Sequence, residues 1–264
     1  MAGRRSRPAP ATRGRHALRS RAFADDLIRS AEVTPGDLVL DLGAGAGMLT
    51  RALRAAGARV VAVELDPGLA LGLRRRFAGD EHVHVVEGDA ARVRLPHEPF
   101  AVVSNLPFAS GTAILRHLLD DPSRPLRRLD AIVEWGLADK RTRVWPSSQL
   151  ACFWGAWYEL GVGRRVARAA FAPPPSVDAA VLRAVRRPAP LVPVADADAY
   201  LALLRRGFAS DAPLQRRLPR RLVHRLAHER GFAPDAAARD LDAHAWASVH
   251  LALAAQRSGR PTGA

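Results

Sequence analysis

The sequence has almost no cysteine and no long apolar run. Its one cysteine, Cys152, stands in the apolar run Ala151–Trp154, so an internal disulfide is excluded and a reducing, cytoplasmic compartment is expected. The histidines are scattered without zinc-type spacing, which argues against a metal site. No apolar run reaches the roughly 18 residues that a membrane helix needs, so no membrane partner is expected.

Lysine is nearly missing and acidic residues are outnumbered. The chain has 40 basic and 26 acidic residues, a formal net charge of +14, and Lys140 is its single lysine. A GC-rich genome favours arginine by itself, but the planar guanidinium also matches phosphate oxygens in pairs. The surplus predicts a polyanionic partner that binds less tightly as salt rises.

Residues 1–20 are predicted to be a basic, flexible N-terminal arm. Seven arginines and no acidic residue lie in residues 1–21, and the segment lacks the apolar centre of a secretory signal. A mitochondrial transit peptide has the same composition, and that alternative stays open. We favour an arm that meets nucleic acid.

Strand and helix patterns alternate after the arm. We expect strands at 38–42, 59–64, 83–86, 100–104 and 129–134, with helices at 25–31, 48–56, 69–77 and 110–119. This series predicts an α/β fold with a mostly parallel sheet and helices on both faces. Two more strands are expected near 157–166 and 177–185, separated by three consecutive prolines.

The amino-acid composition of the chain changes near Arg187. The proline-rich stretch 188–194 predicts a linker after a catalytic domain of residues 21–187. Residues 195–256 have helical spacing, with Pro219 at a helix start and Gly231 at a helix stop. We expect a small, all-helical, RNA-binding C-terminal domain there, followed by a tail of residues 257–264.

The first expected strand runs into a glycine-rich turn. Asp41 precedes Gly43, Gly45 and Gly47. Glycine lets the backbone turn sharply and approach a ligand, and the next helix points its N-terminus at that ligand. The dinucleotide form of this motif needs glycine where Met48 stands, so a nicotinamide cofactor is disfavoured. The pattern looks like that of methyltransferases.

Polar residues follow the next three strands as well. Glu64 is placed to accept both hydroxyl hydrogens of a ribose, Asp89 to accept from an adenine amine, and Asn105 follows the fourth strand. A single carboxylate at such a position is usually a turn or helix cap. Several in register at the carboxyl ends of strands predict a cofactor site.

The tetrapeptide Asn105-Leu106-Pro107-Phe108 carries the predicted chemistry. An aromatic amine is a poor nucleophile, because its lone pair is delocalised into the ring. If the Asn105 side-chain oxygen and the Leu106 carbonyl accept its two hydrogens, the lone pair turns toward a methyl donor. Pro107 would fix the turn and Phe108 would stack on the base, which must leave its helical stack to enter the pocket.

With these residues in place, the chain resembles the ribosomal RNA adenine N6-methyltransferases, and most of all their erythromycin-resistance branch. The stretches 41–47, 105–108, 133–141 and 171–178 match that family's pattern. The resemblance implies a class I S-adenosylmethionine-dependent methyltransferase fold. Its Rossmann-like sheet has seven strands with the last one antiparallel, and a helical C-terminal domain follows.

One part of the family pattern is missing. The usual Gln-Asn-Phe-Leu falls on Arg15-His16-Ala17-Leu18, where Leu18 alone matches, so cofactor affinity or the ordering of this segment is in question. With that position included, the expected residues for binding S-adenosyl-L-methionine are Leu18, Asp41, Gly43, Gly45, Gly47, Glu64, Leu65, Gly88, Asp89, Ala90 and Asn105.

The resemblance implies a monomeric bacterial enzyme that methylates N6 of one adenine in naked or partly assembled large-subunit (23S) rRNA. Such methylation confers resistance to macrolide, lincosamide and streptogramin B antibiotics. Three alternatives stay open: a small-subunit rRNA dimethyladenosine transferase, a DNA adenine methyltransferase, and an RNA-binding factor that retains the fold without catalysis.

Arginines dominate part of the predicted helical domain. Eight of them lie between residues 203 and 230, opposed by two acidic residues. Phosphate contacts would position the RNA, although part of the set is expected to be a solvated helix face. The predicted RNA-binding residues are Arg164, Arg165, Arg205, Arg206, Arg216, Arg217, Arg220 and Arg221.

Overall fold

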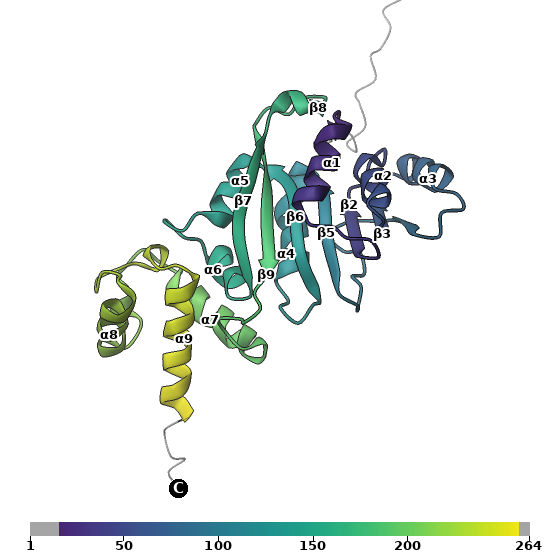
Figure 1. Ribbon diagram of the computed structural model, residues 1–264. Coiled ribbons are helices and arrows are strands. Elements are labelled where there is room, and N and C mark those ends of the chain that lie inside the picture. Colours follow the sequence, from purple (N-terminus) through teal and green to yellow (C-terminus); the bar gives the residue numbers. More distant parts are fainter. Residues whose placement is uncertain (1–15, 259–264) are drawn as a thin grey trace, which may run out of the picture.

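The computed structural model describes residues 16–258 and contains a seven-stranded sheet (Figure 1). The strand order is β4-β3-β2-β5-β6-β9-β7, and β9 alone runs opposite to the other six strands. The strands are β2 (Leu38–Leu42), β3 (Arg59–Glu64), β4 (Val83–Glu87), β5 (Phe100–Asn105), β6 (Leu126–Glu134), β7 (Tyr158–Val166) and β9 (Ala179–Arg186). The expected seven-stranded, mostly parallel sheet with an antiparallel last strand is confirmed.

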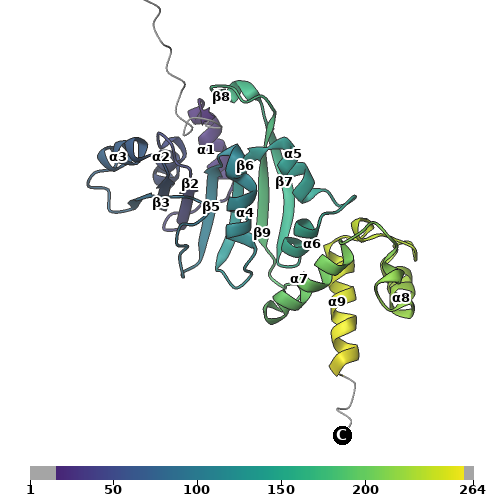
Figure 2. The same cartoon turned by 180° about the vertical axis from the view of Figure 1, so that it is seen from behind.

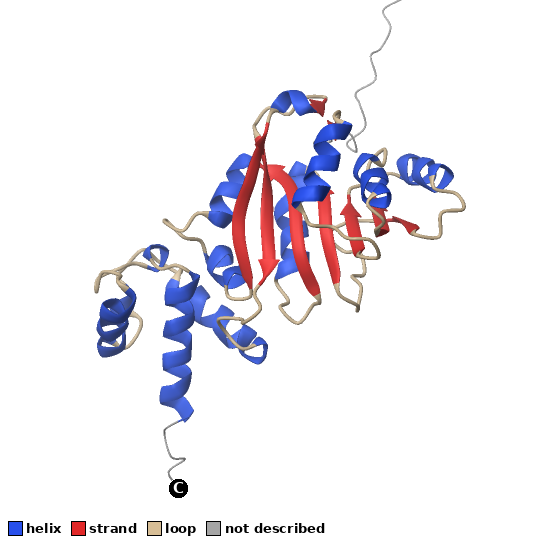
Figure 3. Cartoon of the chain, viewed as in Figure 1, coloured by secondary structure: helices blue, strands red, loops and turns tan. Residues whose placement is uncertain are grey.

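Helices cover both faces of the sheet, as Figures 2 and 3 show. One hydrophobic cluster joins α1 (Arg21–Ser30) and α2 (Met48–Ala55) to the sheet, and a second joins α4 (Gly111–Leu119) and α6 (Gln149–Gly155) to the opposite face. β2 is buried at all five positions, which explains its unbroken apolar run. The remaining helices beside the sheet are α3 (Pro67–Arg76) and α5 (Trp135–Thr142).

Three helices follow the last strand of the sheet, and they pack against the hydrophobic cluster that contains α4 and α6. They are α7 (Ala197–Gly207), α8 (Arg220–Arg230) and α9 (Ala243–Ser258). Tyr200 and Trp246 are buried in the same cluster as Trp154 and Trp157. Gly207 lets Trp246 lie against α7, because a Cβ there would be 2.2 Å from the indole. No helix within residues 16–258 combines the length and apolarity of a membrane span.

The predicted linker is held against the sheet domain. Val192 is fully buried, and the Leu191 amide donates to the Ala156 carbonyl over 2.8 Å. The core therefore continues through residues 188–194, and the division into two domains stays a prediction.

A two-stranded sheet joins the start of the described chain to the loop before β9. β1 (Ala17–Leu18) pairs antiparallel with β8 (Phe171–Ala172). Residues 16–20 are thus part of the fold, which corrects their assignment to a flexible arm. Two-residue strands have no alternation for a sequence pattern to detect. The rest of the predicted arm, 1–15, and residues 259–264 of the predicted tail lie outside the described residues.

Candidate active site

A cavity of about 350 Å³ opens at the carboxyl ends of β2 and β5. The chain leaves β2 toward β3 on one side, while β5 lies on the other, so this is the point where the strand order reverses. Just below it, the Ser104 hydroxyl accepts a hydrogen bond from the Leu42 amide over 2.8 Å. That side chain replaces a strand–strand hydrogen bond where β2 and β5 diverge.

The glycine turn and the 105–108 turn are in direct contact. Gly43 has a φ of +79°, and a Cβ at this position would lie 3.0 Å from Pro107 Cδ. Gly45 also has positive φ, and its amide donates to Glu64 Oε2 over 2.8 Å. The two sequence motifs that were expected to face each other therefore share one cavity wall.

Glu64 anchors the turns around the cavity. Its buried carboxylate accepts from the Gly45 amide and, over 2.9 Å, from the Asp66 amide. Glu64 also lines the cavity, at the position where the sequence predicted an acceptor for ribose hydroxyls. Leu65, beside it, lines the cavity and is 63% exposed, an apolar surface available to a flat ring.

Asp89 also lines the cavity, together with Gly88 and Ala90. Its Oδ1 accepts from the Ala91 amide over 2.9 Å, so it caps a turn as isolated carboxylates after strands usually do. The Gly88 amide donates to the Glu64 carbonyl over 2.9 Å. The turn after β4 is therefore fixed to the end of β3.

Only one of the two polar atoms of the Asn105 side chain has a hydrogen-bond partner among residues 16–258. Its Nδ2 donates to the His16 carbonyl over 2.7 Å, whereas Oδ1 is buried with no hydrogen-bond partner among residues 16–258. Leaving a buried acceptor unpaired costs about 1–3 kcal/mol. An N–H donor of a ligand bound in this cavity would satisfy the Asn105 oxygen.

Phe108 stands at the edge of this cavity in a small aromatic group. Its ring centroid lies 5.2 Å from that of His16 and 6.2 Å from that of Phe171. The ring is partly exposed, while Leu106 is buried and donates its amide to the Ile132 carbonyl over 3.0 Å. The turn is thus anchored to β6 and presents one aromatic ring.

Three of the expected cofactor residues do not line the cavity, and each packs or hydrogen-bonds within the surrounding fold. Leu18 is buried against α1 and α2. A Cβ on Gly47 would lie 2.6 Å from Leu73 Cδ2, so this glycine serves the packing of α3. Asp41 accepts a hydrogen bond from Thr50 over 2.7 Å, and burial, with a smaller contribution from the charge of Glu64, raises the pKa of Asp41 to about 7.

None of the eight predicted RNA-binding arginines lines the cavity. Arg164 pairs with Asp26 and lies over Phe23, and Arg165 lies 3.9 Å over the Trp135 ring. In the C-terminal helices, Arg206 and Arg217 donate to each other's carbonyls. The exposed ones there are Arg205, Arg206, Arg216, Arg220 and Arg221. Their binding to RNA stays a prediction.

His16 is the main cavity residue that the sequence did not predict firmly. Its carbonyl orients Asn105, its ring packs beside Phe108, and its Nδ1 lies 2.9 Å from the Pro173 carbonyl. The gap in the family pattern at residues 15–17 falls on this position. Other lining residues that were not predicted are Ala17, Ala46, Val63, Leu69, Ala109, Ser110 and Ile114.

Comparisons with known proteins point to one family. The family model described as ribosomal RNA adenine dimethylase matches residues 11–254. The mycinamicin-resistance protein MyrB of Micromonospora griseorubida is 39% identical over 253 residues, covering 91% of this chain and 79% of the relative. The ribosomal RNA small subunit methyltransferase A of a Synechococcus strain is 33% identical, covering 89% of each.

A solved structure agrees. The 23S rRNA methyltransferase ErmE superimposes with a TM-score of 0.78 at 29% identity, covering 90% of this chain and 99% of that one. Coverage is not uniform among relatives. The chain spans 61% of the length of two Bacillus proteins named rRNA adenine N-6-methyltransferase, to which it is 32% identical.

Proposed function

This chain belongs to the ribosomal RNA adenine dimethylase family, and we propose that it methylates the N6 amine of an adenine in ribosomal RNA. Its fold is that of the class I S-adenosylmethionine-dependent methyltransferases. The observation that carries the proposal is the unpartnered Asn105 Oδ1 in the wall of a cavity that also contains the glycine turn.

The residues around the cavity fit S-adenosylmethionine. Gly43 and Gly45 bring backbone without side chains to the cavity at the carboxyl end of β2. Glu64 and Asp89 line the same cavity, and carboxylates are the acceptors that ribose hydroxyls and an adenine amine need. When bound, this cofactor supplies a methyl group on a positively charged sulfur. The acceptor, not the donor, then needs activation.

Asn105 and Leu106 activate the acceptor amine in this proposal. The Oδ1 of Asn105 and the backbone carbonyl of Leu106 accept the two amine hydrogens, so the nitrogen becomes pyramidal and its lone pair, no longer delocalised into the ring, points at the methyl donor. Phe108 stacks on the base that has left its helix. The chain's contribution is positioning, and no strong general base is required.

We further propose that the target is in large-subunit rRNA and that methylation confers macrolide-type resistance. Likeness to MyrB and to ErmE favours this target. Likeness to the small subunit methyltransferase A of Synechococcus favours the alternative, an adenine of small-subunit rRNA.

Primer extension on both rRNAs separates these targets. The wild-type chain and Asn105→Ala would be expressed in a macrolide-sensitive bacterium, with drug susceptibility measured in parallel. We expect a modification-dependent stop on large-subunit RNA and raised resistance with the wild type alone. A stop confined to small-subunit RNA would transfer the assignment to the alternative. A single methyl group leaves one N6 hydrogen for base pairing and gives no stop, so methylated adenine is also measured by mass spectrometry of both rRNAs. Finding none that depends on the wild-type chain would reject the activity.

A further inference from the structure

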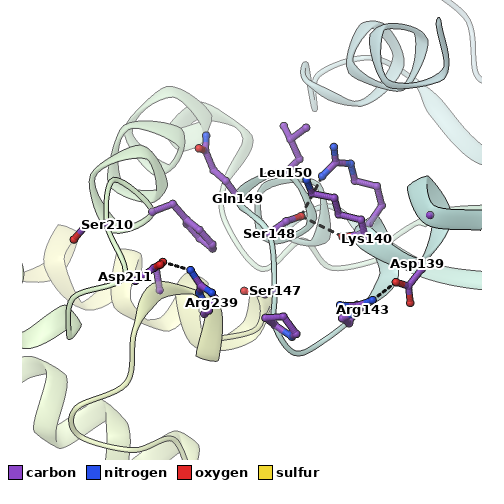
Figure 4. Close-up of a pocket in the computed structure, with 15 residues that line it drawn as sticks. Asp139, Lys140, Arg143, Ser147, Ser148, Gln149, Leu150, Ser210, Asp211 and Arg239 are labelled. Carbon is purple, nitrogen blue, oxygen red and sulfur yellow. Dashed lines mark hydrogen bonds and ion pairs between the residues drawn. The ribbon is translucent and has the colours of Figure 1, made fainter. Parts of the chain in front are cut away.

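A second and larger pocket lies between α5, the start of α6 and two segments of the C-terminal region, 208–211 and 238–239 (Figure 4). Its volume is about 700 Å³, within the range that accommodates a nucleotide-sized ligand. The family-like stretch 133–141 supplies part of one wall, and no step of the proposed methyl transfer uses it. The polar side chains that matter here are Lys140, Arg141, Arg143, Ser148, Asp211 and Arg239.

Arg141 is a buried charge without a carboxylate. The residue is 8% exposed, and within the described chain no acidic group lies in ion-pair distance of its guanidinium. Its Nη1 donates to Ser148 Oγ over 3.3 Å, but its Nε is buried with no partner among residues 16–258. Burial, with the nearby positive charge of Arg116, lowers the pKa of Arg141. Its guanidinium carbon lies 5.7 Å from the centre of the Trp154 ring, which is a partner but not a counter-charge. An anion in the pocket would supply that counter-charge.

The other charges of the pocket leave a positive surplus. Arg143 pairs with Asp139, and Arg239 pairs with Asp211, so these four side chains balance (Figure 4). Lys140 makes no ion pair in the described part of the chain. Lys140 and Arg141 together therefore provide two uncompensated positive charges, which suit the oxygens of a phosphodiester.

An exposed tryptophan lies in the loop that joins α5 to α6, and other residues of this loop line the pocket. Trp145 is 65% exposed, although its neighbours Arg143 and Pro146 line the pocket. Its indole N–H donates to the Asp240 carbonyl over 3.0 Å, which fixes the ring while much of its surface stays open. An aromatic ring held in this way beside cationic groups is typical of a base-stacking platform.

We propose that this pocket is a second RNA subsite, which binds one unpaired nucleotide other than the target adenine. Lys140 and Arg141 hold its phosphodiester, and Trp145 stacks on its base. The proposal rests on the proposed rRNA substrate and deepens it, because it gives the enzyme a contact with RNA that is separate from the methyl-transfer cavity.

Steady-state methylation of an rRNA transcript tests the subsite. Arg141 is left intact because loss of a buried guanidinium can unfold the chain. We expect Lys140→Gln and Trp145→Ala each to raise KM for RNA about tenfold, with much smaller changes in kcat, and Trp145→Phe to restore most of the affinity. Lys140→Gln should also make the slope of log affinity against log salt shallower, by the amount that about one phosphate contact contributes.

Arg75→Gln is the matched control for charge. Arg75 lies on α3, at the opposite end of the sheet from α5 in both views, and makes no ion pair within residues 16–258 (Figures 1 and 2). It should leave KM for RNA unchanged. An equal rise of KM in this variant and in Lys140→Gln would reduce the effect to net charge and overturn the subsite.

Photo-crosslinking gives a readout that does not depend on activity. A transcript with 5-iodouridine in its unpaired positions should crosslink to the peptide that contains Trp145. The absence of a crosslink to this peptide would overturn the RNA subsite. So would binding of inorganic phosphate that depends on Lys140, if no RNA crosslink forms. If Asn105→Ala loses transfer while Lys140→Gln and Trp145→Ala keep the wild-type KM, the subsite fails and the proposed function stands.

Discussion

Asn105 and His16 meet across 89 positions of sequence through one hydrogen bond, from Nδ2 to the backbone carbonyl over 2.7 Å. The bond fixes the amide so that Oδ1 remains as the unpaired acceptor. Asn105→Ala removes this acceptor without touching the basic surfaces. We expect methyl transfer to fall about a hundred- to a thousandfold, as for loss of one preorganised transition-state contact, with RNA affinity nearly unchanged. Transfer assays and filter binding on the same preparation check this, and an active variant would refute the role of Asn105.

Gly36→Ala is a matched control for Gly43→Ala. Both glycines have positive φ, but a Cβ on Gly43 would lie 3.0 Å from Pro107 Cδ, whereas one on Gly36 meets nothing within 4 Å. Alanine at either position costs about 1–2 kcal/mol of backbone strain. We therefore expect Gly36→Ala to lower stability alone, and Gly43→Ala also to weaken S-adenosylmethionine binding about tenfold or more. Calorimetric titration of both variants decides this, and equal cofactor affinities would mean that the Gly43–Pro107 contact does not shape the site.

Asp41 should make stability depend on pH. Burial raises its pKa to about 7, so the folded state holds the proton more tightly than the unfolded state, where the carboxyl ionises near 3.8. The folded form binds more protons between these two values, and its stability therefore falls as pH rises through that window. Three pKa units correspond to about 4 kcal/mol at most.

Asp41→Asn removes this titration and keeps an oxygen acceptor for Thr50. We expect the variant to gain in melting temperature relative to the wild type as pH rises from acidic toward mildly alkaline values. Thermal melts of both proteins across that range measure the difference. A difference that does not change with pH would show that Asp41 does not titrate in this window.

Sequence patterns found the centre of the sheet because strands such as β2 and β5 are buried on both faces. The strands at 38–42 and 59–64 have the predicted bounds, since a short apolar run between turns has few other interpretations. Helices α5 and α6 were missed. The α5 segment is rich in charged residues with only Ala138 and Arg141 buried, so it has little apolar periodicity to detect.

The cofactor wall was predictable because its residues directly follow strands whose carboxyl ends meet. The part contributed by His16 was not. It acts through a backbone carbonyl, which any residue type supplies, and it is held by Pro173, 157 positions away. The same limit applies to the pocket around Arg141, whose walls come from α5 and from the C-terminal region and whose chemistry depends on burial.

Phe108 offers a test of base stacking. Its ring lies beside His16 and Phe171 and is partly exposed at the cavity. Stacking of a base on an aromatic ring is worth about 1–3 kcal/mol, so Phe108→Ala should lower kcat/KM about ten- to a hundredfold. Phe108→Tyr keeps the ring and should stay close to the wild type. Equal losses in both variants would indicate a packing defect, which thermal melts would reveal.

The N-terminal arm provides the last prediction, and it concerns charge alone, since residues 1–15 lie outside the described structure. Deleting residues 1–14 removes four arginines and no acidic residue, and leaves His16 in place. If each arginine neutralises one phosphate, the slope of log affinity against log salt should become shallower by roughly three units. Binding of an rRNA transcript is therefore expected to weaken strongly at low salt and little at high salt. A variant with a neutral segment of equal length separates charge from chain length: it should behave like the deletion if charge acts. A salt slope equal to that of the wild type in both variants would remove the arm from the RNA interface.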